Sequence, residues 1–596
     1  MNDNIIGFLT NSLPGFCNVS IKEITSGIYA EGKIKLAGKD ATLNIYLDEF
    51  FPMHKPKFIL QPADLFGPLP HIGRDGEVCY TSDEGICLDS ENPEGILTES
   101  FEMVLRTLSD GITGKNHDDL MNEVVAHFRH TDGCLEYNGN LSLTDVVKCV
   151  KKCTIKSIDR IFLGDSEIKI IEYCNKYYGF KVMESVEYDD VIYIPLKKGT
   201  MLPFKWFDSF WELQELSKVI SENINRTNRK YLVKQLKKKV PNKPILIVLM
   251  VYSPNGNKVL LGFLIENIKE KGDKLLKSHP LLLTVGDSYV KPVVINRHDS
   301  EYLMPRGGVV NSAKDMKVAI VGCGSVGSYI AQEIAKAGVA SISLFDDDCF
   351  NEANIYRHVL GINDVNYCDK LEQGRYSCIN IPKAYGLKRS IERNLPYTTI
   401  NVEMAHLGKV ENIILKESVD FKEFNLVIVA LGNSNVELFL NKLFHSSTGY
   451  PPVIFTWVEA YGIGGHALVT NNRGNSGCLK CLYSDETTMN NKAHFSGPNQ
   501  IFAKDLSGCA NMFTPYGSLD SVQTAILATR LAINVLNGNE KDNPILSWKG
   551  STDMFFSNGY ILSERYAFST EELEKRKLLY KMKNCPICGS KVSGEK

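Results

Sequence analysis

Near the N-terminus, apolar and polar residues alternate with the period of β-strands. Residues 27–36 and 41–47 place an apolar side chain at every second position, which predicts antiparallel strands with one polar face. Residues 97–109 and 118–129 repeat their apolar side chains with helical spacing instead. Together these patterns predict an α+β domain that spans residues 1–135.

The middle of the chain has a less regular pattern. Residues 136–240 mix strand-like and helix-like stretches, and we interpret them as a linker or middle region. Residues 245–252 are continuously apolar and run into the turn Ser253-Pro-Asn-Gly256, so they predict a buried strand that enters a hairpin. We expect residues 241–312 to form a strand-rich region that leads into the last domain.

Strand and helix patterns alternate over residues 313–596, which predicts a doubly wound α/β sheet. Its first strand, residues 317–321, is apolar from Val318 onwards, and a helical pattern follows over residues 325–337. The turn between them holds three glycines, Gly322, Gly324 and Gly327. Such glycines allow a tight turn and a close approach of the backbone, and the helix N-terminus presents free amides to a phosphate.

A second strand, residues 341–345, ends in Asp346. An acidic residue at this place can hold the diol of a nucleotide ribose. The strand, the glycine turn and the helix therefore predict a nucleotide site. A NAD-dependent oxidoreductase of the Rossmann type would account for this much of the pattern.

Composition narrows the class of protein. At 596 residues the chain exceeds a single core, and the usual size of domains indicates roughly three to four of them. Its 67 basic and 70 acidic residues give a net charge of −3, so no overall field attracts nucleic acid or anionic lipid. Basic residues gather between positions 226 and 239, where they would contact a partner's phosphates or form a solvated helix face. We expect neither nucleic acid nor a membrane among the partners.

The sequence also predicts a compartment. Residues 1–7 lack the basic region and apolar stretch of a signal peptide, and the longest apolar run is too short to span a bilayer. Sixteen cysteines in so long a chain do not predict a disulfide framework. We therefore expect a cytoplasmic protein.

Four of the cysteines form two CxxC pairs about 100 residues apart: Cys478 with Cys481, and Cys585 with Cys588. Each pair can supply two edges of a tetrahedral thiolate site, and together they predict a structural zinc. A redox role would need one pair and would leave the other unexplained.

Asp346 also opens a longer motif. Asp346-x-Asp348-x5-Asn354-x2-Arg357 is followed by Lys383 just before the next helical pattern. This order resembles that of the ThiF/MoeB and ubiquitin-activating adenylation family, whose members use ATP. The resemblance implies that Asp346 binds the ribose and that Asn354, Arg357 and Lys383 contact the phosphates. The charges agree, because adenylation needs cations around a triphosphate whereas hydride transfer does not.

The chain departs from this family at one position. After the apolar strand at residues 426–430 the family usually places an aspartate that holds Mg²⁺, but this sequence has Leu431-Gly432-Asn433. Asp348 is the candidate that replaces this ligand.

Cys509 lies among small and polar residues, just before the helical pattern at residues 520–536. Such surroundings favour an accessible thiol, and a nearby helix N-terminus lowers the pKa of a cysteine. In the resembling enzymes a cysteine in this region takes the acyl group from the adenylate. A buried structural cysteine remains the alternative. Cys323, inside the glycine turn, is too constrained to be the acceptor.

A second cysteine motif stands in the N-terminal domain. Ile72-x3-Gly76-x-Val78-Cys79 resembles the segment of ubiquitin-conjugating enzymes that carries their catalytic cysteine. The upstream segment Phe51-Pro-x3-Pro-x-Phe58 resembles a proline-rich segment of the same fold.

Two further residues bear on this motif. The family's asparagine, which steadies an oxyanion, is replaced here by His71, and a histidine can also donate a hydrogen bond. Cys87 is the rival of Cys79. Because Cys87 alternates with Ile86 and Leu88 like a strand residue, we prefer Cys79.

The order of the domains resembles the bacterial fusions of an activating and a conjugating enzyme, and most closely those of CBASS anti-phage operons. The resemblance implies a relay. ATP and Mg²⁺ would activate a partner's C-terminal carboxylate, Cys509 and then Cys79 would carry it as a thioester, and an amine on a target protein would receive it.

The resemblance further implies the partners. The activated protein would be a cyclic-oligonucleotide synthase or a ubiquitin-like protein, and the adenylation domain would form a homodimer. Three other functions stay open. A sulfur-carrier adenylyltransferase would share the last domain, an oxidoreductase would share the glycine turn, and a non-enzymatic scaffold would carry an inactive conjugating domain.

Overall fold

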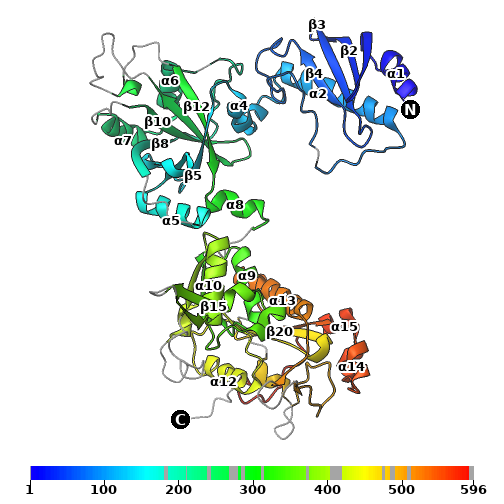
Figure 1. Ribbon diagram of the computed structural model, residues 1–596, viewed down its shortest axis with the longest axis vertical. Helices are drawn as coiled ribbons and strands as arrows, with labels where there is room; N and C mark the ends of the chain where they lie inside the picture. The colour runs from blue at the N-terminus through cyan, green and yellow to red at the C-terminus, as the bar shows by residue number, and fades with distance from the viewer. Residues whose placement is uncertain are drawn as a thin grey trace. The chain divides into compact units, whose positions relative to one another are not determined.

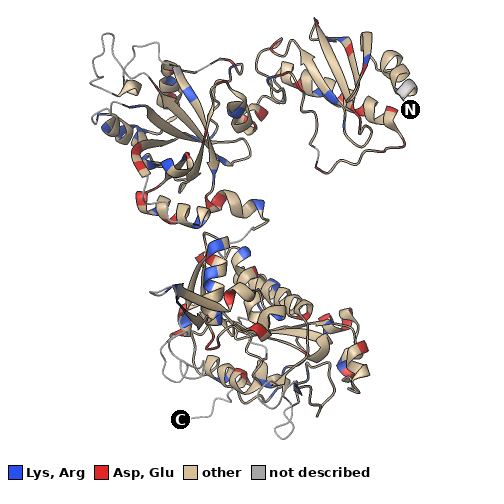
Figure 2. Cartoon of the chain, in the orientation of Figure 1, with Lys and Arg blue, Asp and Glu red and all other residues tan. Residues whose placement is uncertain are grey.

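The protein is described from a computed structural model, shown in Figure 1. The structure divides into two compact units, Met1–Asp299 and Ser300–Lys596, and each is described by itself. Both signs of charge occur across each unit (Figure 2). The described residues are 2–82, 84–179, 186–209, 211–237, 243–266, 279–282, 289–309, 315–370, 375–402, 419–472, 477–483, 490–505 and 512–589.

The N-terminal part of the first unit is a four-stranded antiparallel sheet covered by helices. Its strands follow one another in the order β1-β2-β3-β4, and the predicted strands are confirmed as β2 and β3. Inward side chains of the sheet pack against one face of α2, which forms the domain's core. The elements are α1 (Asn2–Asn11), β1 (Cys17–Ile24), β2 (Gly27–Leu36), β3 (Lys39–Asp48), β4 (Lys57–Gln61) and α2 (Pro93–Thr113).

Helix α2 begins where the sequence supplies both a cap and a proline. The side chain of Asn92 accepts a hydrogen bond from the backbone N–H of Gly95, and Pro93 occupies the first helical position, where no N–H is needed. Two short helices follow, α3 (Asp119–Asn122) and α4 (Val124–His130). They lead from this domain into the next sheet.

The rest of the first unit is one sheet that closes on itself. The strand order is β11-β10-β8-β6-β7-β5-β12-β9, and β11 also pairs with β12. The expected division at residue 240 is therefore not a boundary of the fold, because β10 pairs with β8 and β12 pairs with β5 across it. The strands are β5 (Leu135–Asn140), β6 (Lys148–Ile155), β7 (Arg160–Gly164), β8 (Val186–Pro195), β9 (Trp211–Glu212), β10 (Ile245–Tyr252), β11 (Lys258–Ile265) and β12 (Tyr289–Arg297).

This closed sheet, called the barrel below, is apolar on both faces. One set of side chains fills its inside, and the other packs against α4, α6 and α7 on its outside. The side chains of β10 pack on both faces of the sheet. Every residue of Ile245–Tyr252 is buried, as the sequence predicts. The helices are α5 (Glu167–Tyr178), α6 (Leu213–Asn223) and α7 (Arg226–Leu236).

The second unit contains a seven-stranded sheet in the order β17-β14-β13-β18-β19-β20-β23. Its first five strands are parallel, as expected for a doubly wound sheet, and β20 and β23 add antiparallel pairs. The strands are β13 (Lys317–Val321), β14 (Ser341–Phe345), β17 (Thr399–Val402), β18 (Leu426–Val429), β19 (Val453–Val458), β20 (Gly464–Thr470) and β23 (Ile545–Lys549).

The strand order reverses direction between β13 and β18. In open parallel sheets a ligand crevice opens at this point, at the carboxyl ends of the strands. Helices cover the sheet, and the ones that matter for the site are α9 (Ser325–Lys336), the 3₁₀ helix η4 (Glu352–Arg357), α10 (Lys383–Asn394), α12 (Ser434–Phe444) and α13 (Ser518–Leu536).

One pair of cysteines is disulfide-bonded, although the sequence predicts no disulfide framework. Cys368 and Cys378 form a disulfide between β15 (Asn366–Lys370) and β16 (Tyr376–Asn380). The two residues face each other directly in the antiparallel pair, with their Cα atoms 4.1 Å apart. Among the described residues, no helix combines the length and apolar character needed to cross a membrane.

Candidate functional site

The glycine turn lies at the carboxyl end of β13, where the strand order reverses. Gly322 has a φ of 95°, and a side chain there would collide with the carbonyl oxygen of Ala430 at 2.6 Å. A side chain at Gly327 would collide with the carbonyl of Gly322 at 1.9 Å. Gly324 differs, because the space that its side chain would take is open. The turn therefore offers backbone amides and open space at the start of α9, and this fits a phosphate group.

Asp346 follows β14 and holds the glycine turn in place. Its carboxylate accepts hydrogen bonds from the backbone N–H groups of Cys323, at 2.6 Å, and Asp348, at 2.9 Å. Burial raises the pKa of Asp346, while Lys383 and the two backbone bonds act in the opposite direction. Cys323 is fully buried, and burial raises the pKa of its thiol.

Lys383 and Asp348 meet beside this carboxylate. The Lys383 ammonium group lies 2.8 Å from the Asp348 carboxylate, and the backbone N–H of Lys383 also donates to the Asp348 carbonyl oxygen. The lysine side chain is only 10% exposed, whereas the aspartate side chain is 71% exposed. The structure thus brings together a buried cation and an accessible carboxylate at the crevice.

Arg357 and Asn354 both lie on η4. The Arg357 guanidinium lies 5.1 Å from the ring of Tyr516, whose hydroxyl is hydrogen-bonded to Ser325 at the start of α9. Arg357 is therefore linked to the glycine turn through one tyrosine. Asn354 accepts a long hydrogen bond from the backbone N–H of Asn351, the residue that caps the start of η4.

Two residues that contact the turns of this site are not part of the sequence motif. His358 is buried, and its Nε2 atom lies 2.8 Å from the carbonyl oxygen of Cys323 while its Nδ1 atom accepts from the backbone of Leu360. Burial lowers the pKa of His358 to about 4, so the neutral ring braces the glycine turn. Sequence spacing does not predict this contact because it depends on how η4 folds back.

Glu437 is the second such residue. It is buried at the start of α12 and accepts a hydrogen bond from the backbone N–H of Gly432. Burial raises its pKa to about 7, although backbone bonds in the Gly432 turn lower it. Glu437 therefore holds the turn where the adenylation family places its metal-binding aspartate.

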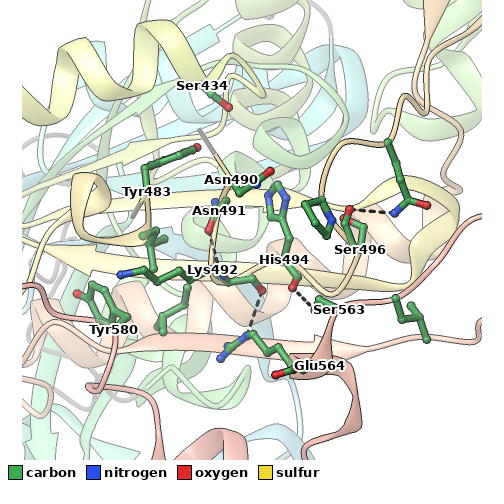
Figure 3. Close-up of a pocket in the computed structure, with 18 of the residues that line it drawn as sticks. Ser434, Tyr483, Asn490, Asn491, Lys492, His494, Ser496, Ser563, Glu564 and Tyr580 are labelled. Atoms are coloured by element: carbon green, nitrogen blue, oxygen red, sulfur yellow. Dashed lines mark hydrogen bonds between the residues drawn. The ribbon is translucent and has the colours of Figure 1, made fainter. Parts of the chain in front are cut away.

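A groove of about 870 Å³ opens beside this turn (Figure 3). It adjoins a smaller cavity of about 180 Å³ that reaches Gly432 and Glu437. Tyr483, His494 and Ser496 line both spaces. The groove therefore leads from the surface towards the end of β18.

A buried carboxylate at the end of β19 holds one wall of the groove. Glu459 accepts hydrogen bonds from the backbone N–H of Phe495, at 2.6 Å, and from the N–H and hydroxyl of Ser496, at 2.9 and 2.6 Å. His466, fully buried, places its Nε2 atom 2.8 Å from the same carboxylate. Burial alone would raise the pKa of Glu459, but the hydrogen bonds and His466 lower it to about 2. The group is therefore ionised and fully bonded.

Glu459→Gln is expected to lower the free energy of unfolding of the second unit by about 3–5 kcal/mol, because an amide would turn N–H groups towards buried donors. Urea unfolding of the full chain measures the change. Glu423→Gln, an exposed position, serves as the control and should stay within about 0.5 kcal/mol of the wild type. Equal stability of both variants would contradict this account.

In the N-terminal domain, Cys79 is exposed at the end of a short hairpin. Its backbone N–H donates to the carbonyl oxygen of His71 at 2.8 Å, and the buried neighbour Val78 donates to Phe58 on β4. Cys87 is also exposed, but it lies outside any strand, and its neighbour Ile86 is 38% exposed. The expected strand alternation at Cys87 is therefore wrong, and exposure does not separate the two thiols.

His71 lies across the hairpin from Cys79. Its ring nitrogens face two carboxylates, Glu123 at 2.5 Å and Asp119 at 3.2 Å. Hydrogen bonding to Glu123 raises the pKa of His71, burial opposes the rise, and Asp119 adds to it. Both nitrogens are thus occupied by carboxylates, whereas the sequence predicts a donor to an oxyanion.

The four cysteines of the CxxC pairs come together. Their sulfur atoms all lie within 4.8 Å of one another, with 3.7 Å between Cys478 and Cys585 and 3.4 Å between Cys481 and Cys588. Four thiols in so small a space fit a tetrahedral metal such as zinc. Cys509, the predicted acyl acceptor of the adenylation domain, lies outside the described residues.

Comparisons with known proteins agree with the two halves of this arrangement. Residues 303–539 match the ThiF family, and residues 22–132 match the prokaryotic E2 family B. The chain is 22% identical over 524 residues to the ATP-dependent ubiquitin transferase-like protein Cap2 of Pseudomonas aeruginosa, covering 84% of this chain and 86% of the relative. It is 23% identical to the protein of the same description from Escherichia coli, covering 87% and 86%.

Among solved structures, the chain is similar over part of its length to the Escherichia coli MccB complex with ATP. The identity is 15%, the TM-score is 0.31, and the match covers 47% of this chain and 68% of MccB. The class of enzyme follows from the two family matches and from the Cap2 relatives. The chain joins a ThiF domain to a prokaryotic E2 domain, and it is an enzyme of the activating and conjugating type.

Proposed function

We propose that the protein uses ATP to activate the C-terminal carboxylate of a partner protein and passes the acyl group through Cys509 and Cys79 to an amine. The observation that carries this proposal is the joining of a nucleotide crevice and an exposed, hairpin-borne Cys79 in one chain. A carboxylate has no good leaving group, so a condensation with an amine needs this activation.

In the first step the partner's carboxylate oxygen attacks the α-phosphorus of ATP, giving an acyl-adenylate and pyrophosphate. The open space at Gly324 receives the phosphates, and Lys383 neutralises part of their charge. Arg357, near the start of α9, adds a second cation. Asp348 would hold Mg²⁺, which, when bound, neutralises phosphate oxygens.

The groove fits the partner's C-terminal tail. It extends from the surface to the cavity at Gly432, which follows β18, the strand that pairs with β13. An extended segment lying in it would bring its last carboxylate towards the nucleotide. The Glu459 contacts matter for this step because they fix the wall that carries His494 and Ser496.

Two transfers follow. The Cys509 thiolate attacks the acyl carbon and releases AMP, forming a thioester. The Cys79 thiolate then attacks that thioester and releases Cys509 as a thiolate. An amine finally attacks the Cys79 thioester, losing a proton and releasing the thiol, which leaves an amide.

The family resemblance supplies the finer part of this proposal. The partner would be a cyclic-oligonucleotide synthase or a ubiquitin-like protein, and the setting would be bacterial anti-phage defence. A homodimer through the ThiF domain belongs to the same proposal. A cytoplasmic location suits the chemistry, because the relay needs ATP and reduced thiols.

Lys383→Ala is expected to slow ATP–pyrophosphate exchange by about 10²–10³-fold, since it removes a preorganised charge from the phosphates. The assay uses purified full-length protein, labelled pyrophosphate and a candidate cyclic-oligonucleotide synthase with an intact C-terminus. Arg393→Ala, an exposed change on the same helix α10, should leave the rate unchanged. Exchange that is equal in Lys383→Ala and wild type would remove Lys383 from the site, and bound NAD in place of exchange would sink the proposed function.

A further inference from the structure

In the hairpin that carries Cys79, His71 lies on the opposite side and faces Cys79. The backbone N–H of Cys79 donates to the His71 carbonyl oxygen, Ile72 and Val78 form a β-bridge, and Gly73 donates to Glu77. Because these bonds pair the two sides, a displacement of His71 is passed directly to Cys79.

His71 has a conformation that needs outside support. Its φ is 65°, in the left-handed region that non-glycine residues seldom adopt. Glu123 provides that support twice, because one carboxylate oxygen accepts from the His71 backbone N–H at 2.9 Å and the other lies 2.5 Å from ring Nδ1. Ring Nε2 lies 3.2 Å from Asp119.

This arrangement needs a protonated ring. Carboxylates at this distance accept hydrogen bonds, and a neutral imidazole has a single N–H to give, so two facing carboxylates favour the imidazolium. Asp119 and Glu123 are the charged groups that act on His71, and both raise its pKa against the effect of burial. Arg74, which lies in the same hairpin, forms an ion pair with Asp132.

The two carboxylates belong to a segment anchored elsewhere. Asp119 begins α3, and Glu123 lies between α3 and α4. The next residues, Val124 and Phe128, are buried among the side chains on the outside of the barrel. His71 is thus held from a segment that is packed on the barrel, while β4 holds the other side of the hairpin through Val78.

We propose that Asp119 and Glu123 are positioning residues for Cys79, acting through a clamp on His71. The clamp fixes the hairpin, and the hairpin fixes the place of the thiol. This inference rests on the proposed function of Cys79 as the conjugating thiol. It assigns His71 a positioning role in place of a hydrogen bond to an oxyanion.

The test follows the pH dependence of Cys79 alkylation by iodoacetamide, read at the Cys79 peptide by mass spectrometry on full-length protein without ATP. The wild type should show an inflection from His71 that is separate from the ionisation of the thiol. A raised pKa means that the clamp is complete below the ordinary imidazole range and is lost as the pH rises through the raised value. Glu123→Gln should move this inflection down by about one pH unit, the usual effect of one nearby opposite charge.

Asp119→Asn should move the inflection in the same direction by less, because it removes the longer contact. Glu102→Gln, an exposed change on α2, should leave the profile unchanged. Thermal melting of each variant shows whether the domain is folded, and if Glu123→Gln unfolds, Asp119→Asn decides. A profile in both variants that superimposes on that of the wild type overturns the inference. Because no partner or ATP is used, failure of the relay itself appears separately, as absent pyrophosphate exchange.

Discussion

Replacing Cys79 by alanine is expected to abolish amide conjugates while ATP–pyrophosphate exchange and a thioester on Cys509 persist. Alanine has no nucleophile to accept the acyl group, and removal of a covalent nucleophile lowers turnover on the order of 10⁶-fold in a well-studied case. The measurement combines exchange with gel analysis of adducts, before and after reduction. A reducible adduct mapped to Cys79 in the wild type, together with a Cys509 adduct that remains in Cys79→Ala, would assign the second transfer.

Cys87→Ala is the matched control, since Cys87 is equally exposed and lies in the same domain but outside the hairpin. It should conjugate like the wild type. The opposite pattern, with Cys87→Ala inactive and Cys79→Ala active, would move the catalytic role to Cys87. If both variants retain full conjugation, the N-terminal domain is not a conjugating domain in this enzyme.

Cys585→Ser is expected to remove the bound metal and destabilise the second unit by several kcal/mol. We infer zinc from the four clustered thiols, and structural zinc binds model peptides with about 10–16 kcal/mol that is coupled to folding. Three of the four cysteines are buried within one apolar cluster, which also contains Tyr580 and Leu482. The site therefore ties the C-terminal segment to the 3₁₀ helix at Leu479–Leu482.

Metal content by mass spectrometry and the midpoint of thermal unfolding measure this effect. Cys17→Ser, an exposed cysteine on β1 in the first unit, should keep both the metal and the midpoint. Because Leu482, Tyr483 and Tyr580 line the groove, loss of the metal should also slow pyrophosphate exchange. Purified protein without metal that unfolds at the same temperature as the zinc-loaded form would refute the zinc site.

Local patterns predicted the elements that carry the nucleotide site. The segments Lys317–Val321 and Ser341–Phe345 became strands with the expected bounds, because β-branched and other apolar residues predominate in both and buried parallel strands are rich in them. The glycine turn could also be predicted, since its geometry is fixed over a few residues. The two CxxC pairs were brought together by the fold as their spacing required.

Contacts between distant segments could not be predicted in this way. The clamp joins His71 to Glu123, and the wall of the groove joins Glu459 to Ser496. A carboxylate in a helical pattern looks the same whether it faces solvent or a buried histidine. The barrel escaped prediction for a related reason, because periodicity shows that a stretch is a strand but not which strand is its neighbour.

The closure of the barrel has a consequence for synthesis of the chain. Leu135 at the start of β5 pairs with Val293 in β12, so the barrel stays open until the ribosome has released nearly the whole first unit. The strands β1 to β4 follow one another in the sheet in sequence order and can form much earlier. Between these two events, β5 and β11 lack their partner β12 and the apolar faces of the barrel are exposed, and this interval is when the nascent protein most needs a chaperone.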